Sequence, residues 1–345
     1  MILPGRDADS IVRALQALRG GELVGLPTET VYGLAADAGN EAAVAKIFAS
    51  KGRPSNHPLI VHVRDAGGVA HFADNVPAFA HQLINAFWPG PLTLILARRM
   101  GVAAAAAGGQ NSIGLRCPSH PVAQTLLAAL AALPHPVHGL AAPSANQFGR
   151  VSPTTAAHVQ SEMGDDLLIL DGGPCDVGIE STIVDCTRGV PVLLRPGRIT
   201  PAQMKAACGL DLLSEDELSL ISETAPRASG TLESHYAPNA KVRLMDEKAL
   251  QHALDMLGDD MDSRPGAAPD SPPIIAVYSR AVLKSRSGKV LRRRMPDDAA
   301  ATAQQLFAVL RDFDVQGVKL IWVETPPPTA GWDGVRDRLT RASAA

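Results

Sequence analysis

The sequence predicts a two-domain α/β protein, in which a larger mixed α/β domain precedes a smaller domain with an open parallel sheet. Three observations support this prediction. The 345 residues exceed the usual size of one hydrophobic core. Hydrophobic residues make up 46% of the chain and charged residues 19%, which excludes wholesale disorder. Apolar runs of strand length alternate with segments of helical periodicity along most of the chain.

The first helical segment carries Ile11, Leu15 and Leu18 at helical spacing, with Asp9 or Ser10 as its cap and Gly20-Gly21 as its end. Thr200 and Pro201 predict the N-cap and first turn of a helix that closes the domain near Cys208. Between them we expect helices at 40–51, 77–87, 122–133 and after 152–154, and strands at 23–26, 59–63, 92–96, 113–117, 141–143, 167–170, 181–185 and 192–195.

Residues 214–238 lose clear periodicity and predict an interdomain linker, so the expected domains are 1–208 and 241–345, joined by a linker at 209–240. The second domain is expected to contain strands at 242–245, 274–277 and 318–323, and helices at 247–257, 297–313 and 332–341. The Asp-, Pro- and Gly-rich segment 258–273 predicts a mobile surface loop. Residues 292–294 are three arginines, which suit either an RNA contact or, with the better odds, a solvated loop.

Charge and cysteine content exclude several classes of protein. The net charge of −3 gives no bulk attraction to nucleic acid, so an RNA contact would need a local basic patch. The four cysteines are scattered without a close pair, which indicates neither a zinc site nor a disulfide framework and fits a reducing cytosol. The sequence shows no signal-peptide pattern and no long apolar run, so we expect a cytoplasmic protein without a membrane partner.

Cationic side chains recur in polar loops and at the ends of apolar strands. Lys51 and Arg53 lie in a basic turn, while Arg116 and Arg195 each end an apolar run before a proline or Cys-Pro pair. Arginine presents a planar fork of donors and lysine a compact charge, so such positions suit phosphate and carboxylate groups. A solvated helix end explains the basic turn equally well by itself. His62, within an apolar strand, is either a ligand or a core histidine with a satisfied partner.

Two further loops are rich in hydroxyl and small residues. The segment 27–35 leaves a strand with several threonines, and segments 142–146 and 149–154 combine small residues, donors and a helix start suited to an anion. Ordinary capped turns are the alternative for each loop taken alone. A Gly-rich loop that ends in Gly-Lys-Ser/Thr and a Gly-x-Gly-x-x-Gly motif are both missing, which disfavours a standard P-loop or dinucleotide fold.

In their order along the chain, these segments resemble the threonylcarbamoyl-AMP synthase family in its long two-domain form. The resemblance rests on PTETVYGLAAD (27–37), KGRPSNHPLIVH (51–62), FWPGPLTLIL (87–96), GLRCP (114–118), APSAN with SPT (142–154), ESTIVD (180–185), LRPG (194–197) and SGTLESHYAP (229–238). It implies a twisted mixed-sheet YrdC-like domain with helices, followed by a linker and a smaller Rossmann-like open parallel α/β domain.

The resemblance also implies a reaction. The family condenses L-threonine, bicarbonate and ATP into threonylcarbamoyl-AMP and pyrophosphate, for modification of the tRNA adenosine beside the anticodon. Both reacting partners are anions, so the site must neutralise charge and hold geometry, and no nucleophilic side chain is expected. The implied cofactor is Mg²⁺ bound through ATP, with no dedicated metal cage and no organic cofactor. A tRNA or a threonylcarbamoyl-transferase protein is the further partner to which the family points.

By resemblance, a set of side chains is assigned to each substrate, with Arg116 as the clamp for the threonine carboxylate and with Lys51 and Arg53 neutralising charge. His57 stands where the family often has asparagine. The linker residues His235 and Tyr236 would fold over the triphosphate as a lid that excludes water. The threonine set is Thr30, His62, Arg116 and Ser181; the ATP set is Lys51, Arg53, His57, Ser112, Ala142, Ser144, Asn146, Ser152, Arg195, His235 and Tyr236.

Two alternatives remain at this stage. One is a non-catalytic RNA-binding or ribosome-associated factor, which the net charge of −3 and the 4% content of aromatic residues disfavour. The other is a carbamoyl transferase for another acceptor, since related domains occur in hydrogenase maturation proteins. Those proteins carry zinc-finger cysteine pairs, which this sequence lacks.

Overall fold

The structure is a computed structural model that describes residues 1–214, 217, 226–228, 230, 235–257, 275–281, 283–285 and 287–344. The chain divides into two compact units. Unit 1 comprises Met1–Phe148 and Ser152–Thr231, and unit 2 comprises Gly149–Val151 and Leu232–Ala345. The predicted mobile loop at 258–273 and most of the predicted linker at 215–234 lie outside the described residues.

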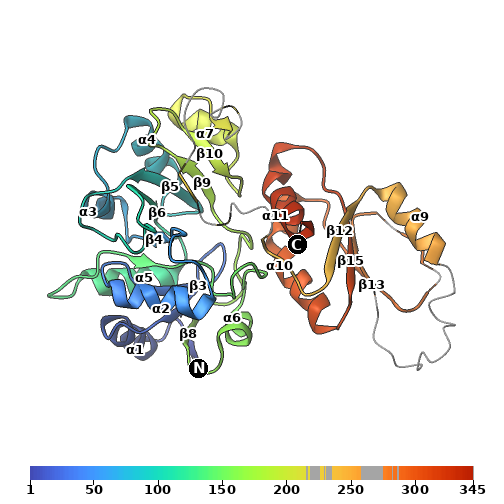
Figure 1. The fold of residues 1–345 in the computed structure, drawn as a ribbon, viewed down its shortest axis with the longest axis horizontal. Coiled ribbons are helices and arrows are strands. Elements are labelled where there is room, and N and C mark those ends of the chain that lie inside the picture. Colours follow the sequence, from blue (N-terminus) through green and yellow to red (C-terminus); the bar gives the residue numbers. More distant parts are fainter. Residues whose placement is uncertain are drawn as a thin grey trace. The chain divides into compact units, whose positions relative to one another are not determined.

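The strands of unit 1 belong to one mixed sheet. They are β1 (Ile2–Pro4), β2 (Val24–Leu26), β3 (Gly33–Asp37), β4 (Ile60–His62), β5 (Leu92–Ala97), β6 (Ser112–Arg116), β7 (Leu140–Ala141), β8 (Leu168–Asp171), β9 (Thr182–Asp185), β10 (Val192–Arg195) and β11 (Leu213–Ser214). Their order across the sheet is β1-β8-β2-β3-β7-β4-β6-β5-β9-β10-β11 (Figure 1). The sheet contains parallel pairs such as β4 with β6 and antiparallel pairs such as β5 with β6, which confirms the predicted mixed sheet.

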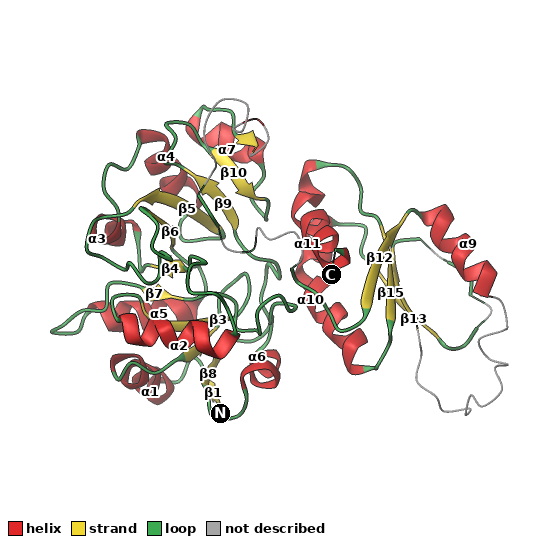
Figure 2. Cartoon of the chain, viewed as in Figure 1, coloured by secondary structure: helices red, strands yellow, loops and turns green. Residues whose placement is uncertain are grey.

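Helices cover this sheet on both faces (Figure 2). They are α1 (Ala8–Arg19), α2 (Glu41–Lys51), α3 (Val69–Phe72), α4 (Ala78–Phe87), α5 (Pro121–Ala131), α6 (Ala156–Met163) and α7 (Pro201–Cys208), with a 3₁₀ turn at Ala66–Gly68. Helices α1 and α5 pack with Leu26, Leu140 and Leu170 in one cluster. Helices α2, α4 and α7 pack on the other face of the sheet, around residues such as Val61 and Leu94.

Local signals in the sequence set several helix ends. Helix α2 begins after Asn40, whose side chain accepts from the Ala43 amide, and ends at Gly52 with φ 61°. Helix α7 begins with the predicted Thr200 cap. The predicted cap of the first helix was wrong, because Asp7 accepts from the Ser10 amide and the helix begins at Ala8. Asp7 has extended backbone directly after a turn, so the helix starts earlier than its apolar stripe suggests.

Unit 2 contains an open parallel sheet, as predicted. Its strands are β12 (Lys241–Met245), β13 (Ile275–Ser279), β14 (Val290–Arg294) and β15 (Leu320–Glu324); its helices are α9 (Glu247–Leu257), α10 (Ala299–Val315) and α11 (Asp333–Ser343), with a 3₁₀ turn at Ala330–Trp332. In the described part of the unit, the strands lie in the order β12-β15-β13-β14 and every pair is parallel. Helix α9 lies on one side of this sheet and α10 and α11 lie on the other (Figure 1).

The interpretation of residues 292–294 as a solvated loop was wrong, because they form the second half of strand β14. This strand is at the edge of the sheet and pairs with β13. All three arginine side chains are exposed, and Arg293 and Arg294 form ion pairs with Asp312 at 3.3 Å and Asp297 at 2.7 Å. An edge strand with so little buried surface lacks the apolar alternation by which strands are predicted.

None of the helices that the structure describes is both long and apolar enough to cross a membrane.

Gly197, in the loop after β10, approaches the start of β9 closely. A Cβ atom at Gly197 would lie 2.6 Å from the backbone nitrogen of Thr182 and 3.0 Å from the carbonyl oxygen of Glu180. Because neither backbone atom can move without distorting the strand, we expect Gly197→Ala to lower the free energy of unfolding by about 1–3 kcal/mol. Urea unfolding measures this loss. Gly20→Ala is the control, because there the nearest atoms lie at 3.4 Å; equal stability of both variants would contradict the prediction.

Candidate functional site

Several of the predicted polar side chains lie on one face of the sheet in unit 1, because they occupy alternate positions of neighbouring strands. His62 on β4 and Thr93 on β5 are both register partners of Arg116 on β6. Register partners point to the same face, opposite to intervening residues such as Val61 and Leu115, which belong to the core around α2 and α4. His62, Thr93 and Arg116 are all buried. The pleat of the strands therefore builds a buried polar cluster on the face opposite that core.

Arg116 is held by three neighbours. Its Nη1 donates to Thr30 Oγ1 at 2.7 Å, its Nε donates to the carbonyl oxygen of Gly90 at 3.3 Å, and its Nη2 lies 2.7 Å from Glu29 Oε1. Both partners of the ion pair are buried, with side-chain exposures of 4% and 7%. An arginine has five N–H donors. Among the described residues only the Nε and Nη1 contacts are hydrogen bonds, while Nη2 meets Glu29 as an ion pair without a hydrogen bond. Both terminal nitrogens therefore keep N–H donors, as a carboxylate clamp requires.

His62 is a neutral imidazole at physiological pH. Burial and the adjacent Arg116 charge lower the pKa of His62 to about 3. Its Nδ1 is buried and has no hydrogen-bond partner among the described residues. A core histidine with fully satisfied nitrogens was the alternative interpretation, and the structure does not support it at Nδ1. One ring nitrogen is therefore available to a ligand.

Ser181 connects the predicted threonine set with the predicted ATP set. Arg195 donates through Nε to the Ser181 carbonyl at 3.0 Å and through Nη2 to Ser181 Oγ at 3.2 Å. The Thr93 hydroxyl lies 2.8 Å from the same Ser181 oxygen. The guanidinium of Arg195 is also buried, so a second fixed positive charge lies at this end of the polar cluster.

Lys51, the last residue of α2, points into the protein and not into solvent. Its Nζ donates to the carbonyl oxygen of Ser144 at 2.6 Å and to that of Asn146, and the residue is only 2% exposed. Burial, together with the charge of Arg53, lowers the pKa of Lys51 to about 7. Two of three ammonium donors have partners among the described residues, so one is available to an anion. The solvated helix end is therefore excluded for Lys51.

The remaining residues of the basic turn pack around Phe148. The Arg53 guanidinium carbon lies 5.6 Å from the centre of the Phe148 ring, and the His57 ring meets the same ring edge-on at 5.5 Å. Arg53 also donates to the carbonyl oxygen of Pro58 at 2.9 Å. Burial and the charges of Arg53 and Arg227 lower the pKa of His57. A neutral His57 offers one donor and one acceptor nitrogen, so it combines both hydrogen-bonding roles as an asparagine amide does.

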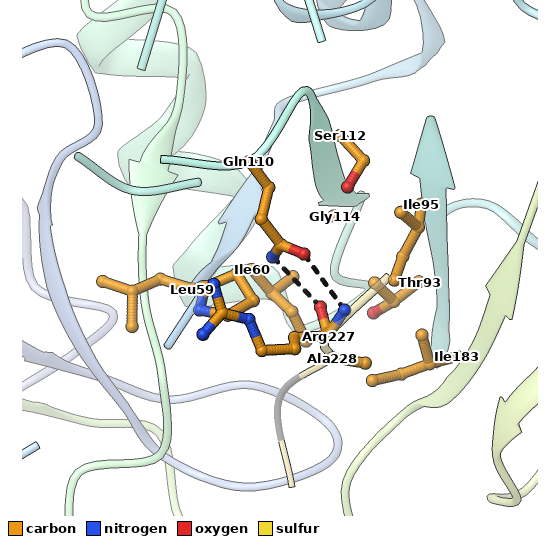
Figure 3. Close-up of a pocket in the computed structure, with 11 residues that line it drawn as sticks. Leu59, Ile60, Thr93, Ile95, Gln110, Ser112, Gly114, Ile183, Arg227 and Ala228 are labelled. Carbon is orange, nitrogen blue, oxygen red and sulfur yellow. Dashed lines mark hydrogen bonds between the residues drawn. The ribbon is translucent and has the colours of Figure 1, made fainter. Parts of the chain in front are cut away.

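A pocket lies over the same half of the sheet, and Ser112 and Gly114 of β6 line it (Figure 3). The Gln110 side chain pairs with the backbone of Arg227: its Nε2 donates to the Arg227 carbonyl at 3.3 Å, and its Oε1 accepts from the Arg227 amide at 3.0 Å. Ala228 then packs against the cluster that includes Ile95 and Ile183. Residues 227–228 of the predicted linker therefore lie over this pocket within unit 1.

Gln110→Glu is expected to release Arg227, because the donor that binds the Arg227 carbonyl becomes a second acceptor. The measurement is the rate of tryptic cleavage after Arg227, which should rise about fivefold if one hydrogen bond is lost and cleavage follows local opening. Gln124→Glu is the matched control, since Gln124 donates to the carbonyl oxygen of Pro118 at 2.6 Å elsewhere in unit 1. Equal cleavage rates for the two variants would contradict the prediction.

The structure places the other predicted residues as follows. Ser152 donates its hydroxyl to Glu180, and the Ala142 amide donates to the carbonyl oxygen of Ile60 at 3.0 Å. His235 and Tyr236 belong to unit 2, where both are buried. The Tyr236 ring stacks on Phe307 at 5.5 Å, and the Arg338 guanidinium lies 5.3 Å from it. The predicted contact of His235 and Tyr236 with ATP stays a prediction.

Sequence reasoning missed Glu29, Thr93, Gln110 and Phe148 as parts of this site. Thr93 is a lone polar residue in an apolar strand, two positions from Ile95, and this is a usable signal for a residue that faces a site. Glu29 lies within the quoted threonine-rich segment, but its partner is 87 positions away, at 116, in the chain. Gln110 and Phe148 lie in loops whose sequences carry no periodic signal.

Comparisons with known proteins agree along the whole chain. A family model described as "Telomere recombination" (Sua5, YciO, YrdC) matches residues 16–197, and one described as "Threonylcarbamoyl-AMP synthase, C-terminal domain" matches residues 199–344. Threonylcarbamoyl-AMP synthase of Bacillus subtilis is 36% identical over 337 residues, which cover 96% of this chain and 92% of the relative. The Schizosaccharomyces pombe protein of the same name is 32% identical over 99% of this chain and 90% of its own. The crystal structure of Pyrococcus abyssi Sua5 complexed with L-threonine matches with a TM-score of 0.84 at 31% identity, over 99% of this chain and 97% of that one.

Proposed function

Because the chain belongs to the threonylcarbamoyl-AMP synthase family, we propose that it is an L-threonylcarbamoyladenylate synthase, which forms threonylcarbamoyl-AMP and pyrophosphate from L-threonine, bicarbonate and ATP. The product is the activated donor for threonylcarbamoylation of the tRNA adenosine beside the anticodon. The observation that carries the proposal is the buried Arg116, which keeps N–H donors on both terminal nitrogens beside the neutral His62. An amino-acid carboxylate fits this arrangement.

The proposed reaction joins two anions. Bicarbonate and the threonine amine form a carbamate with loss of water; a carbamate oxygen then attacks the α-phosphorus of ATP, and the bond to pyrophosphate breaks. Thr30, His62, Arg116 and Ser181 would hold threonine. The negative charge on the phosphates would be offset by Lys51, Arg53 and Arg195. Repulsion between the two anionic reactants is the main barrier to bringing them together. No side chain needs to form a covalent intermediate.

The proposal includes Mg²⁺ that arrives bound to ATP. In the part of the chain that the structure describes, no group of three or more His, Cys, Asp or Glu side chains could hold a metal ion. The side chains of Lys51 and Arg195 are cations that donate hydrogen bonds, which suit phosphate oxygens and cannot ligate a metal ion. When bound, the metal would offset charge on the triphosphate.

His57, Ser112, Ala142, Ser144, Asn146 and Ser152 would complete the nucleotide site. His235 and Tyr236 would act with the linker as a lid that keeps water from the mixed anhydride. Product transfer would require a tRNA or a threonylcarbamoyl-transferase protein. The buried cysteines form no disulfide, which suits the reducing environment of the cytoplasm.

One assay tests the proposed function. The purified full-length protein is incubated with MgATP, L-threonine and bicarbonate, and pyrophosphate release is measured with each component omitted in turn. We expect release to need all of them, and threonylcarbamoyl-AMP to appear in equal amount. Release that is independent of threonine, or none from folded protein, would overturn the proposal. Tight, salt-sensitive tRNA binding without turnover would instead favour an RNA-binding factor.

A further inference from the structure

The loop that holds the Lys51 ammonium wraps around the C-terminal end of α2. The carbonyl oxygens of Ser144 and Asn146 accept from Lys51 Nζ, and the Phe148 amide donates to the Lys51 carbonyl at 2.9 Å. The residue between Asn146 and Phe148 is Gln147, which belongs to neither predicted substrate set. Both neighbours of Gln147 in the chain contact Lys51, so a shift of Gln147 would disturb both contacts.

Gln147 bridges the ends of two helices. Its side-chain Nε2 donates to the Ser50 carbonyl at 3.1 Å, in the last turn of α2, and to the Glu162 carbonyl at 3.4 Å, in the last turn of α6. The last carbonyl groups of a helix have no partner within the helix, and an amide NH₂ group has one hydrogen for each of these two. The backbone amide of Gln147 also donates to Glu162 Oε2 at 3.0 Å. These contacts fix residue 147 between α2 and α6.

Glu162 occupies an unfavourable place for a carboxylate. It is the last residue but one of α6, where the negative end of the helix dipole repels an anion. A glutamate at this position therefore needs a compensating donor outside the helix. The Gln147 amide supplies one, so the carboxylate contributes to the position of the loop and not to the stability of its own helix.

We infer that Gln147 and Glu162 form a positioning pair for Lys51, because they hold the loop whose carbonyl oxygens direct the Lys51 ammonium toward the nucleotide phosphates. The inference rests on the proposed function, since it needs ATP beside Lys51. Both residues would act through the loop and not by contact with the nucleotide. They would therefore control the affinity for ATP and leave the affinity for threonine unchanged.

The charges around Lys51 agree with this geometry. Burial and the charge of Arg53 lower the pKa of Lys51 to about 7, while the charges of Glu162 and Glu180 oppose this decrease. Glu162 therefore favours the charged ammonium, which is the form that opposes phosphate. Removal of the Glu162 charge should lower the pKa of Lys51 below its value in the wild type.

The first test titrates the full-length protein calorimetrically with MgATP and, separately, with L-threonine. Gln147→Leu removes both side-chain N–H donors, and residue 147 is exposed beside an open cavity of about 660 Å³, so leucine fits there. Near pH 6 we expect the Kd for MgATP to rise about fivefold, as for the loss of one hydrogen bond, and the Kd for threonine to stay within about twofold. Gln160→Leu is the matched control, because Gln160 of the same helix α6 donates to Asp165 at 2.7 Å and not to the loop.

The second test separates the charge of Glu162 from its hydrogen bond. Glu162→Gln keeps an oxygen that can accept from the Gln147 amide, so its Kd for MgATP near pH 6 should lie within about twofold of the wild type. As the pH rises, its MgATP affinity should begin to fall at a lower pH than that of the wild type, in which Lys51 loses its proton at about pH 7. Asp166→Asn removes a charge that lines the same cavity, and it should keep the wild-type profile.

Failure of the inference differs from failure of the proposed function. A wild type that binds MgATP but releases pyrophosphate without threonine would overturn only the proposed function. Threonine-dependent release by the wild type, together with a folded Gln147→Leu whose Kd for MgATP is unchanged, would overturn only the inference. So would a Glu162→Gln variant with the wild-type pH profile, since the Glu162 charge would then have no effect on Lys51. If Gln147→Leu does not fold, Gln147→Ala removes the same donors and is judged by the same Kd values.

Discussion

Arg116→Ala is expected to reduce threonine-dependent pyrophosphate release by a factor of about 10²–10³ and to lower the free energy of unfolding by about 3–5 kcal/mol. The two effects have different causes. Activity would fall because the substrate carboxylate would lose its proposed clamp. Stability falls because Glu29, whose side chain is 7% exposed, loses the cation that lies 2.7 Å away and is left as a buried, uncompensated charge. Pyrophosphate assays and urea unfolding measure the two losses separately.

The double variant Arg116→Ala with Glu29→Gln separates these causes. It removes both charges, so most of the lost stability should return while activity stays low. Arg116→Lys retains a positive charge but lacks the planar fork, and we expect it to preserve stability better than activity. If the double variant recovered activity together with stability, Arg116 would be a structural ion-pair partner and not a substrate ligand.

The parts of the fold that local chemistry determines could be predicted from sequence. Helices α2 and α7 carry an N-cap residue, and glycine follows the last residue of each, so their bounds were found within about one residue. Strand β14 was missed because it is an edge strand whose three arginine side chains are exposed, so its pairing with β13 leaves no apolar pattern in the sequence. Hydrophobic periodicity reflects burial, so it does not predict a strand that buries little of its surface.

The difference between local sequence signals and contacts made by strand pairing also applies to the candidate site. Arg116 and His62 could be selected as candidates because each is a polar residue at or near the end of an apolar strand. That they face each other follows from the register of β4 with β6, which no local pattern specifies. Glu29 could not be selected, because its importance lies in its partner, Arg116, which the fold brings to it. Thr93 could have been selected as the lone polar residue of an apolar strand, but its contact with Ser181 could not be predicted.

Lys51→Met is expected to reduce pyrophosphate release by a factor of about 10²–10³, because the variant loses a buried positive charge that would oppose the phosphates. The pKa of Lys51, lowered to about 7 by burial and by Arg53, adds a pH signature. Above pH 7 the free enzyme loses the Lys51 proton, so kcat/KM for ATP should fall. The value of kcat should stay constant to a higher pH, because a bound triphosphate favours the charged form of the Lys51 amine. Lys51→Arg, which cannot lose its proton, should lack the fall in kcat/KM above pH 7 if it binds ATP.

The free energy of unfolding should depend on pH through Lys51 in the opposite direction to kcat/KM for ATP. Between pH 7 and about 10 the unfolded chain keeps the Lys51 proton while the folded protein has released it, so the unfolded state binds more protons and stability rises with pH. Below pH 7 the amine is charged in both states, and the full cost of burying it is present. Lys51→Met should therefore be more stable than wild type near pH 6, by an amount on the order of 3–5 kcal/mol, and this advantage should shrink toward pH 10. Urea unfolding at pH 6, 8 and 10 measures the difference. A constant difference across these pH values would show that Lys51 titrates at its ordinary pKa and that its carbonyl contacts, not its burial, dominate.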